Sequence, residues 1–280
     1  MSAAGYLAIT RPANAVMAGV ATVVAYLVAT GILVMAAVFL FIAVALITAA
    51  GNVINDYCDA EIDAVNRADR PIPSGAVPRT AAAWYAGLLF CAGILACVFT
   101  TPLCLAIAVF NALLLVAYAV RLKGVPVAGN IAVAYLSGSM FLFGGALAGT
   151  GGIVRVVSIA VMTFLAMMAR ELLKDAEDVD GDKAGGALTL PIRIGVKKTA
   201  AWAFAFTLLS VLASFAPAIW WGIPYVILIG FVDMALIIAA FRALSCGTPA
   251  CVRSSGASGA LKYGMFVSLA VFVVGALFLG

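Results

Sequence analysis

The sequence predicts an all-α, polytopic membrane protein. Of its 280 residues, 66% are hydrophobic and 10% charged, whereas soluble domains are about 45–50% apolar. Long stretches carry no charge at all, for example 12–55 and 80–120. No segment shows the alternating pattern of an outer-membrane barrel, and backbone groups in lipid must be satisfied within helices or closed barrels. The spanning elements are therefore predicted to be helices.

Nine spans are expected. A helix needs about 20 apolar residues to cross the hydrocarbon core, so the longest charge-free stretches must each hold two. Glycine and proline mark the breaks, as at Thr30-Gly31 and Thr101-Pro102 and within 149–152 and 217–224. The predicted spans lie near 13–30, 34–56, 81–99, 102–120, 126–147, 154–174, 198–216, 222–243 and 261–279.

The positive charges predict the orientation. If the loops between these spans alternate between the two sides, all 16 lysines and arginines except Arg155 lie on one side. This bias predicts a multi-pass protein of the cell membrane with a cytoplasmic N-terminus. The first span has no signal-peptide pattern before it, and we expect it to be retained. The net charge of +4 then reflects topology and membrane lipid rather than nucleic acid.

Acidic residues gather after the second and sixth predicted spans. In each place three aspartates recur with the same spacing, Asp56, Asp59 and Asp63 in the first and Asp175, Asp178 and Asp182 in the second. The repeat suggests one membrane domain over 1–280, built from two four-helix halves, about 1–124 and 125–260, with a ninth helix added. We refer to the two triplets as the first and second aspartate motifs.

The spacing of each motif indicates a metal site. Residues i, i+3 and i+7 of a helix share one face, so each motif would present three carboxylates together. Such clustering is costly unless a cation neutralises it, and oxygen ligands suit Mg²⁺. The chain has no histidine, which excludes His-based nucleophile activation and the commonest zinc sites. Two Mg²⁺ ions, one at each motif, are expected.

Basic residues flank both motifs, and Arg67, Arg70, Arg121, Lys123 and Lys174 could bind a diphosphate. A diphosphate whose other end lies among membrane helices suggests a polyprenyl diphosphate. Acidic loops are also often solvated caps, and flanking cations can be orientation signals. Asp233, inside a span, could be functional or a contact between helices. A cation-coupled transporter is the alternative of another class, but its acids would lie near the midplane.

The motifs resemble those of the UbiA superfamily of intramembrane prenyltransferases. Asn55, Asp56, Asp59 and Asp63 fit its first motif, N-D-x-x-D-x-x-x-D, and "KDAEDVDGD" its second. "YAVRLK", with Tyr118, and the opening "RPANAVM" are also similar. The resemblance implies nine helices around a central lipid-accessible cavity and Mg²⁺ at both motifs. It also implies diphosphate contacts from Tyr118 and the basic residues, with Arg11 and Asn14 near the acceptor.

Within the superfamily, the sequence most resembles an archaeal branch that makes ether lipids. That resemblance implies transfer of a geranylgeranyl group from geranylgeranyl diphosphate to the free hydroxyl of geranylgeranylglyceryl phosphate, a glycerophospholipid-type acceptor. Cys58 stands where an aromatic residue is expected, and Tyr118 and Lys123 are five residues apart where other branches use four. The alternatives are an aromatic acceptor, such as 4-hydroxybenzoate or a naphthoate, and haem.

Overall fold

The computed structural model describes residues 2–279, apart from the side chain of Asn66, and the regular secondary structure in this part of the chain is all helical, without a strand. Nine helical segments in it are long and apolar enough to cross a membrane. They are α2 (Pro12–Thr30), α3 (Met35–Cys58), α5 (Arg79–Cys97), α6 (Pro102–Val120), α7 (Ala128–Leu147), α8 (Thr150–Glu177), α11 (Val196–Ser214), α12 (Ala218–Leu244), and α14 (Ala257–Val274) with its flanking helices.

The predicted spans agree with these helices to within a few residues at most ends, and the ends have local causes. Thr101 caps α6, because its hydroxyl oxygen accepts the backbone N–H of Cys104 at 3.2 Å, and Pro102 follows at the first helical position. The eighth span was predicted to begin at residue 222. Instead α12 begins at Ala218 and is kinked at Gly222, whose φ of 63° is open to glycine.

Short helices that were not predicted connect the spans. They are α1 (Ala3–Ile9), α4 (Ala60–Asn66), η1 (Leu122–Gly124), α9 (Val179–Ala184), α10 (Leu190–Ile194), α13 (Pro249–Ser255) and the π-helix η2 (Gly275–Leu279). The ninth span accordingly consists of α13, α14 and η2 rather than one helix from 261. These pieces are too short to give a clear periodic signal in the sequence.

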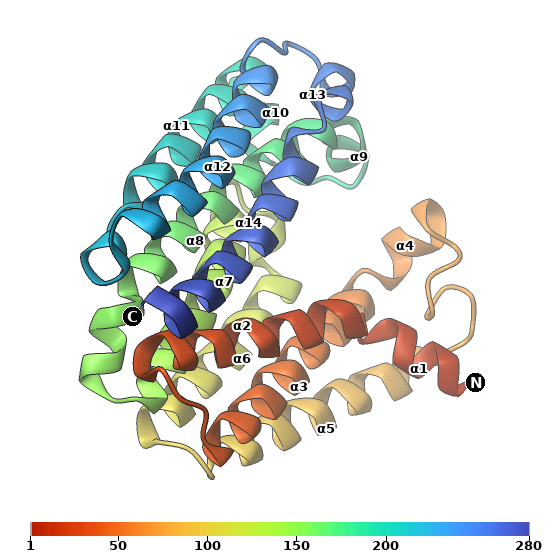
Figure 1. Cartoon of the computed structure of the whole chain (residues 1–280). Helices are drawn as coiled ribbons and strands as arrows, with labels where there is room; N and C mark the ends of the chain where they lie inside the picture. Colours follow the sequence, from red (N-terminus) through yellow and green to blue (C-terminus); the bar gives the residue numbers. More distant parts are fainter. Residues whose placement is uncertain (1, 280) are drawn as a thin grey trace. The chain divides into compact units, whose positions relative to one another are not determined.

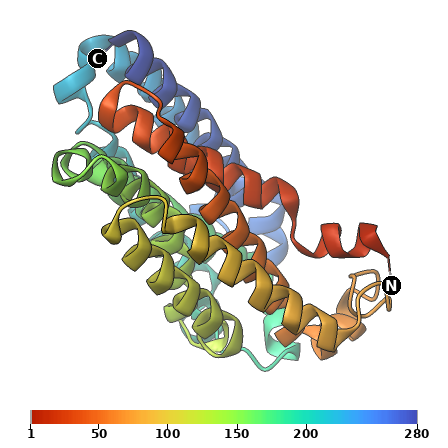
Figure 2. The same ribbon diagram turned by 90° about the horizontal axis from the view of Figure 1, so that it is seen from below.

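The chain forms two compact units. The first holds residues up to Val23 and Leu33–Leu122, and the second Val24–Ile32 and the chain from Lys123 onward. In the first unit α3 packs against α5 and α6 (Figures 1 and 2). A small core at one end joins Ile9 of α1, Val53 of α3 and Ala86 of α5 to Val77 of the loop before α5. The loop after the first aspartate motif is therefore folded onto its unit.

In the second unit α8 is the central helix. It packs against α7, α11 and α14. The contact with α7 is close, because a methyl group at Gly138 would come within 2.6 Å of the Ala160 carbonyl oxygen. Small residues let membrane helices approach in this way. The second aspartate motif thus begins on the helix that contacts α7, α11 and α14 of its unit.

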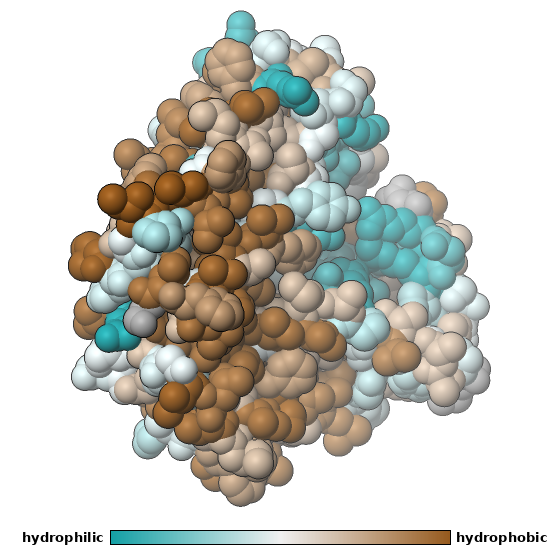
Figure 3. Space-filling model, viewed as in Figure 1, coloured by the Kyte–Doolittle hydropathy of each residue, from teal (hydrophilic) through white to brown (hydrophobic). Residues whose placement is uncertain are grey.

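The outer surface is apolar along the long helices. Hydrophobic residues cover much of the face shown in Figure 3, whereas hydrophilic residues gather over α4 in the first unit. Only 22% of the most apolar stretch of α6 is buried. An exposed apolar surface of this kind suits contact with lipid.

Candidate functional site

The first aspartate motif lies where α3 ends. Asp56 is in the last turn of α3, Asp59 follows that helix with φ −87° and ψ 1°, and Asp63 belongs to α4. The expectation that the three carboxylates share one continuous helix face is therefore wrong. Aspartate is a weak helix former because its side chain competes for backbone hydrogen bonds, and the break falls at the middle aspartate.

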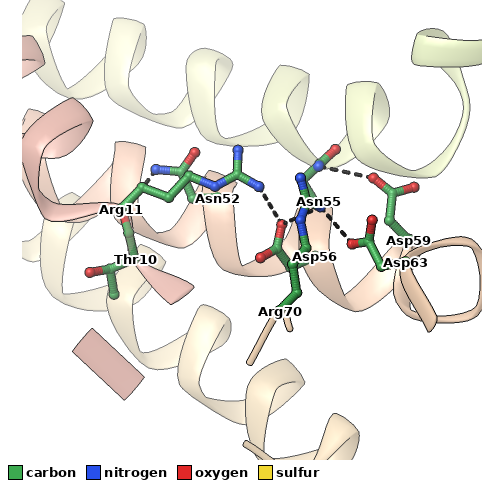
Figure 4. Close-up of polar contacts among 8 residues, drawn as sticks. All are labelled: Thr10, Arg11, Asn52, Asn55, Asp56, Asp59, Asp63 and Arg70. Carbon is green, nitrogen blue, oxygen red and sulfur yellow. Dashed lines mark hydrogen bonds and ion pairs between the residues drawn. The ribbon is translucent and has the colours of Figure 1, made fainter. Parts of the chain in front are cut away.

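Arginines contact two of these acids within the first unit. Asp56 Oδ1 accepts from Arg11 Nη2 at 2.5 Å and lies 3.4 Å from Arg70 Nη1. The same Arg70 nitrogen is 2.5 Å from Asp63 Oδ2 (Figure 4). Asp56 and Asp63 are only 4% and 6% exposed. The arginines therefore supply the counter-charge without which two buried carboxylates would repel each other.

Asn55 and Asp59 form the other contact of the first motif. Asn55 Nδ2 donates to Asp59 Oδ2 at 3.0 Å (Figure 4). Asn55 Oδ1 is buried and has no hydrogen-bond partner in residues 2–279. A buried amide oxygen without a donor is costly, and it is a ligand type that hard cations accept.

The second aspartate motif is interrupted at the same place. Helix α8 ends at Glu177, Asp178 follows with φ −107° and ψ 16°, and Asp182 lies on α9. Here too the prediction of one continuous helix face is wrong. The matching position of the break, at the middle aspartate of each motif, is a second likeness between the two regions.

The contacts of the second motif differ from those of the first. Asp175 Oδ2 accepts from Asn130 Nδ2 of α7 at 2.9 Å. Asp178 Oδ1 is 3.6 Å from Arg253 Nη2, and that nitrogen also donates to the Glu177 carbonyl at 2.6 Å. Asp178 and Arg253 are both exposed, so this pair contributes little to stability.

Asp182 is a poorly compensated acid of the second motif. Its Oδ2 is buried and has no hydrogen-bond partner in the described residues. Burial raises the pKa of Asp182, and the Asp178 carboxylate raises it further. The Thr189 hydroxyl, near but outside hydrogen-bonding geometry, and Lys174 lower it in part. A bound cation would remove this cost.

The predicted diphosphate and acceptor residues are more scattered. Arg67 and Arg121 are exposed just after α4 and α6, and Tyr118 and Lys123 lie at the end of α6 and in η1. Asn14 is exposed in the first turn of α2. Lys174 Nζ is 3.7 Å from Glu171 Oε2, so it contacts that glutamate within α8. Arg11 and Arg70 are the predicted cations that the structure places on the first motif.

No three acidic or cysteine side chains in residues 2–279 converge closely enough to hold a metal ion in this arrangement. The possible metal-ligand atoms of both motifs are nevertheless all oxygens. Two of these oxygens, Asn55 Oδ1 and Asp182 Oδ2, are buried without a hydrogen-bond partner in the described residues, and such oxygens suit a hard cation. In the first motif, arginine nitrogens contact two of the carboxylates that would hold such a cation.

Several polar residues in or near the motifs were not predicted as site residues, and one of them contacts a motif aspartate directly. Asn52 Nδ2 donates to the Thr10 carbonyl at 2.9 Å, and Asn130 donates to Asp175. Glu171 is buried and pairs with Arg170 at 2.5 Å. Both asparagines are polar side chains in apolar spans, and for Asn130 the sequence favours a hydrogen bond between helices, which the contact with Asp175 of α8 confirms. Arg253 gave no signal beyond its charge.

Asp233 lies away from both motifs in sequence. Ser214 Oγ donates to Asp233 Oδ2 at 2.6 Å, and the Tyr225 hydroxyl donates to the Ser214 carbonyl at 2.8 Å. These bonds join α11 to α12 within the second unit. Of the two alternatives for Asp233, a functional role or a contact between helices, the structure therefore supports the contact between helices.

Two cysteines near Arg253 form a disulfide. Cys246 and Cys251, whose Cα atoms are 5.4 Å apart, join the end of α12 to α13. Disulfides persist mainly in oxidising compartments, whereas the orientation predicted from the positive charges places these cysteines on the cytoplasmic side. The bond limits the freedom of the helix that carries Arg253.

The sequence matches known proteins along its whole length. Residues 16–270 match the UbiA prenyltransferase family. A digeranylgeranylglyceryl phosphate synthase from Methanoregula boonei is 57% identical over 279 residues, with 100% of both chains covered. One from Methanospirillum hungatei is 45% identical over 280 residues, again with 100% of both covered.

Solved structures agree in fold. A structure of a digeranylgeranylglyceryl phosphate synthase in membranes has a TM-score of 0.84 and 36% identity, with 98% of each chain covered. A UbiA homologue from Archaeoglobus fulgidus bound to DMAPP and Mg²⁺ has a TM-score of 0.67 and 16% identity, covering 96% of this chain and 99% of its own. At that identity it supports the fold alone. From the family match and the full-length relatives, this chain belongs to the UbiA prenyltransferase family.

Proposed function

We propose that this chain has digeranylgeranylglyceryl phosphate synthase activity. It transfers a geranylgeranyl group from geranylgeranyl diphosphate to the free hydroxyl of geranylgeranylglyceryl phosphate. The observation that carries the proposal is the 57% identity to a synthase of this kind over the whole of both chains. The two aspartate motifs, with oxygen donors and nearby arginines, support a reaction that handles a diphosphate.

Both motifs hold Mg²⁺ in this proposal. Asn55, Asp56, Asp59 and Asp63 are the ligands of one ion, and Asp175, Asp178 and Asp182 of the other. The buried and unpartnered Asn55 Oδ1 and Asp182 Oδ2 support these assignments, and a UbiA homologue is known with Mg²⁺ bound. When bound, the metal neutralises negative charge on the departing diphosphate.

The chain's own residues bind and orient the substrates. Arg67, Arg70, Tyr118, Arg121, Lys123 and Lys174 bind the diphosphate, and guanidinium groups do so through paired hydrogen bonds. Arg11 and Asn14 act on the acceptor side. Apolar side chains of the membrane helices surround the prenyl chain and keep water from the reacting carbon.

The reaction exchanges one carbon–oxygen bond for another. The bond between C1 of the prenyl chain and the diphosphate oxygen breaks, and the diphosphate leaves with the bonding electrons. The acceptor hydroxyl oxygen forms a new bond to C1 and loses its proton. The product is an ether, digeranylgeranylglyceryl phosphate, and diphosphate is released.

The orientation in the membrane follows from charge. All cations except Arg155 lie on one side if the nine spans alternate. We place both motifs at the cytoplasmic face of the cell membrane on this basis. The equal spacing of the motifs and the matching helix breaks support the proposed duplication into two four-helix halves.

A product assay tests the activity. The purified full-length protein is given labelled geranylgeranyl diphosphate, Mg²⁺ and one of four acceptors: geranylgeranylglyceryl phosphate, 4-hydroxybenzoate, a naphthoate or haem. We expect an ether product with the first acceptor alone, and its loss in Asp59→Ala and Asp178→Ala. Transfer to an aromatic acceptor or haem instead, or ion flux in proteoliposomes without any prenyl product, would refute the proposed activity.

A further inference from the structure

The junction between α1 and α2 holds Arg11 in a strained backbone conformation. Arg11 has φ 49°, and Val127 is the other non-glycine residue with positive φ among residues 2–279. Such a conformation is unfavourable for a residue with a side chain and persists only where the surroundings enforce it. Pro12 follows directly and restricts the preceding residue further. Something in this unit must therefore hold Arg11 in place.

Asn52 provides that support. Its side-chain amide donates to the carbonyl of Thr10, the residue before Arg11, at 2.9 Å. The Thr10 hydroxyl in turn donates to the Leu7 carbonyl at 2.7 Å. Asn52 lies on α3 one turn before Asp56, so the same helix supports the junction and carries the acid that Arg11 contacts (Figure 4).

Arg11 forms an ion pair with Asp56, which the proposed function assigns as a metal ligand. Asp56 Oδ1 has Arg11 Nη2 at 2.5 Å and Arg70 Nη1 at 3.4 Å. The Asp56 side chain is only 5% exposed. Mg²⁺ binds oxygen at about 2.0–2.1 Å and demands near-octahedral geometry. A cation that binds Asp56 Oδ1 therefore competes with the two guanidinium groups for that oxygen.

We propose that Arg11 is an internal cation that neutralises Asp56 until a divalent metal ion displaces it, and that Asn52 is the positioning residue that holds Arg11 on Asp56. Displacement frees a guanidinium beside the first motif, where it can bind phosphate oxygens of a substrate. The chain thus exchanges counter-ions at Asp56, so the buried carboxylate is never left without a positive partner. This inference rests on the proposed metal site at the first motif.

Removal of Arg11 should change the metal affinity in an unusual direction. An arginine that merely supports a metal site would weaken metal binding when removed, whereas an arginine that competes with the metal strengthens metal binding when removed. Turnover would still fall in such a variant, because it has no guanidinium at this position to bind the substrate. Asn52 acts through Arg11, so its removal should have an effect in the same direction that disappears once Arg11 is gone.

The test is a titration with Mn²⁺ by electron paramagnetic resonance, on full-length protein without substrate. All variants carry Asp178→Ala, so that the first motif dominates the signal. Arg11→Met should raise Mn²⁺ affinity about tenfold, equivalent to about 1.4 kcal/mol. Asn52→Leu should raise it less, and the double variant should match Arg11→Met. The Mn²⁺ affinity of Arg11→Lys should lie between those of the parent and Arg11→Met. Arg79→Met is the control, because Arg79 pairs with the exposed Glu61, and it should leave the Mn²⁺ affinity unchanged.

The outcomes separate this inference from the proposed function. Unchanged or weaker Mn²⁺ binding in Arg11→Met, with binding intact in its parent, would overturn the exchange at Asp56 alone. An effect of Asn52→Leu that persists in the Arg11→Met background would overturn the role of Asn52. Absence of Mn²⁺ binding in every variant, with or without Asp56→Asn, would overturn both the inference and the metal site on which it rests.

Discussion

The two aspartate motifs have the same spacing and the same helix break, but cations approach the first motif more closely than the second. In the first, Arg11 and Arg70 contact Asp56 and Asp63 at 2.5 Å. In the second, Arg253 approaches Asp178 only to 3.6 Å, and Asp182 Oδ2 has no hydrogen-bond partner in the described residues. Equal spacing in the sequence therefore does not imply equal charge balance in the folded chain.

The difference indicates how each motif is stabilised before substrate arrives. Buried carboxylates need a counter-charge. The first motif obtains it from arginines of its own unit, whereas the second depends more on a neutral hydrogen bond from Asn130 and retains a buried carboxylate oxygen without a hydrogen-bond partner in the described residues. The second motif consequently has more to gain from a cation, and a metal ion meets less competition there.

The largest expected contrast compares Asp63→Asn with Asp182→Asn. Asp63→Asn weakens the partner of Arg70 and should lower the free energy of unfolding by about 1.5–3 kcal/mol, the range for hydrogen bonds to charged groups. Asp182→Asn removes a poorly compensated charge and should not lower the free energy of unfolding. Both variants should lose turnover. Denaturant unfolding in detergent, followed by circular dichroism, measures the first effect, and the product assay the second.

The pH dependence of the free energy of unfolding provides a control for the comparison of Asp63→Asn with Asp182→Asn. Because the pKa of Asp182 is raised in the folded chain, its charged form costs stability as pH rises from the unfolded pKa, about 3.9, through the raised folded value. Any gain from Asp182→Asn should appear above that range and vanish below it. Equal destabilisation by both variants at neutral pH would contradict the difference between the motifs.

A smaller effect is expected at Asn130, which supports Asp175. Asn130→Leu removes the hydrogen bond at 2.9 Å and should weaken metal binding about 10–100-fold, as loss of a group behind a metal ligand usually does. Ser137→Ala is the matched control, because Ser137 lies on the same helix and donates only within it, to Val133. Mn²⁺ titration of both variants checks the prediction. Equal affinities would show that Asn130 does not position Asp175.

Most of the fold could be predicted from the sequence. The requirement for about 20 apolar residues and the breaks at proline and glycine located all nine spans. The sequence failed where helices are short or interrupted. The middle aspartates end their helices, so Asp63 and Asp182 lie on α4 and α9 rather than on the spans. Helical periodicity cannot locate a break of one residue.

The candidate site could be predicted only in part. The spacing predicts the six aspartates as ligands because like charges at equal intervals are unusual in an apolar chain. It could not identify Asn52 or Arg253, whose contacts with Thr10 and Asp178 join segments 42 and 75 residues apart by number. Nor could it predict that Arg11 contacts Asp56, because that contact depends on one strained residue between two helices.

The most direct test of the account is the number of metal ions that the motifs hold. Mn²⁺ is titrated into the full-length protein in the presence of diphosphate, and bound ions are counted by electron paramagnetic resonance. We expect two ions per chain, one after Asp59→Ala, one after Asp178→Ala and none after both. A single ion in the unaltered chain, or a count that neither substitution changes, would contradict the assignment of one ion to each motif.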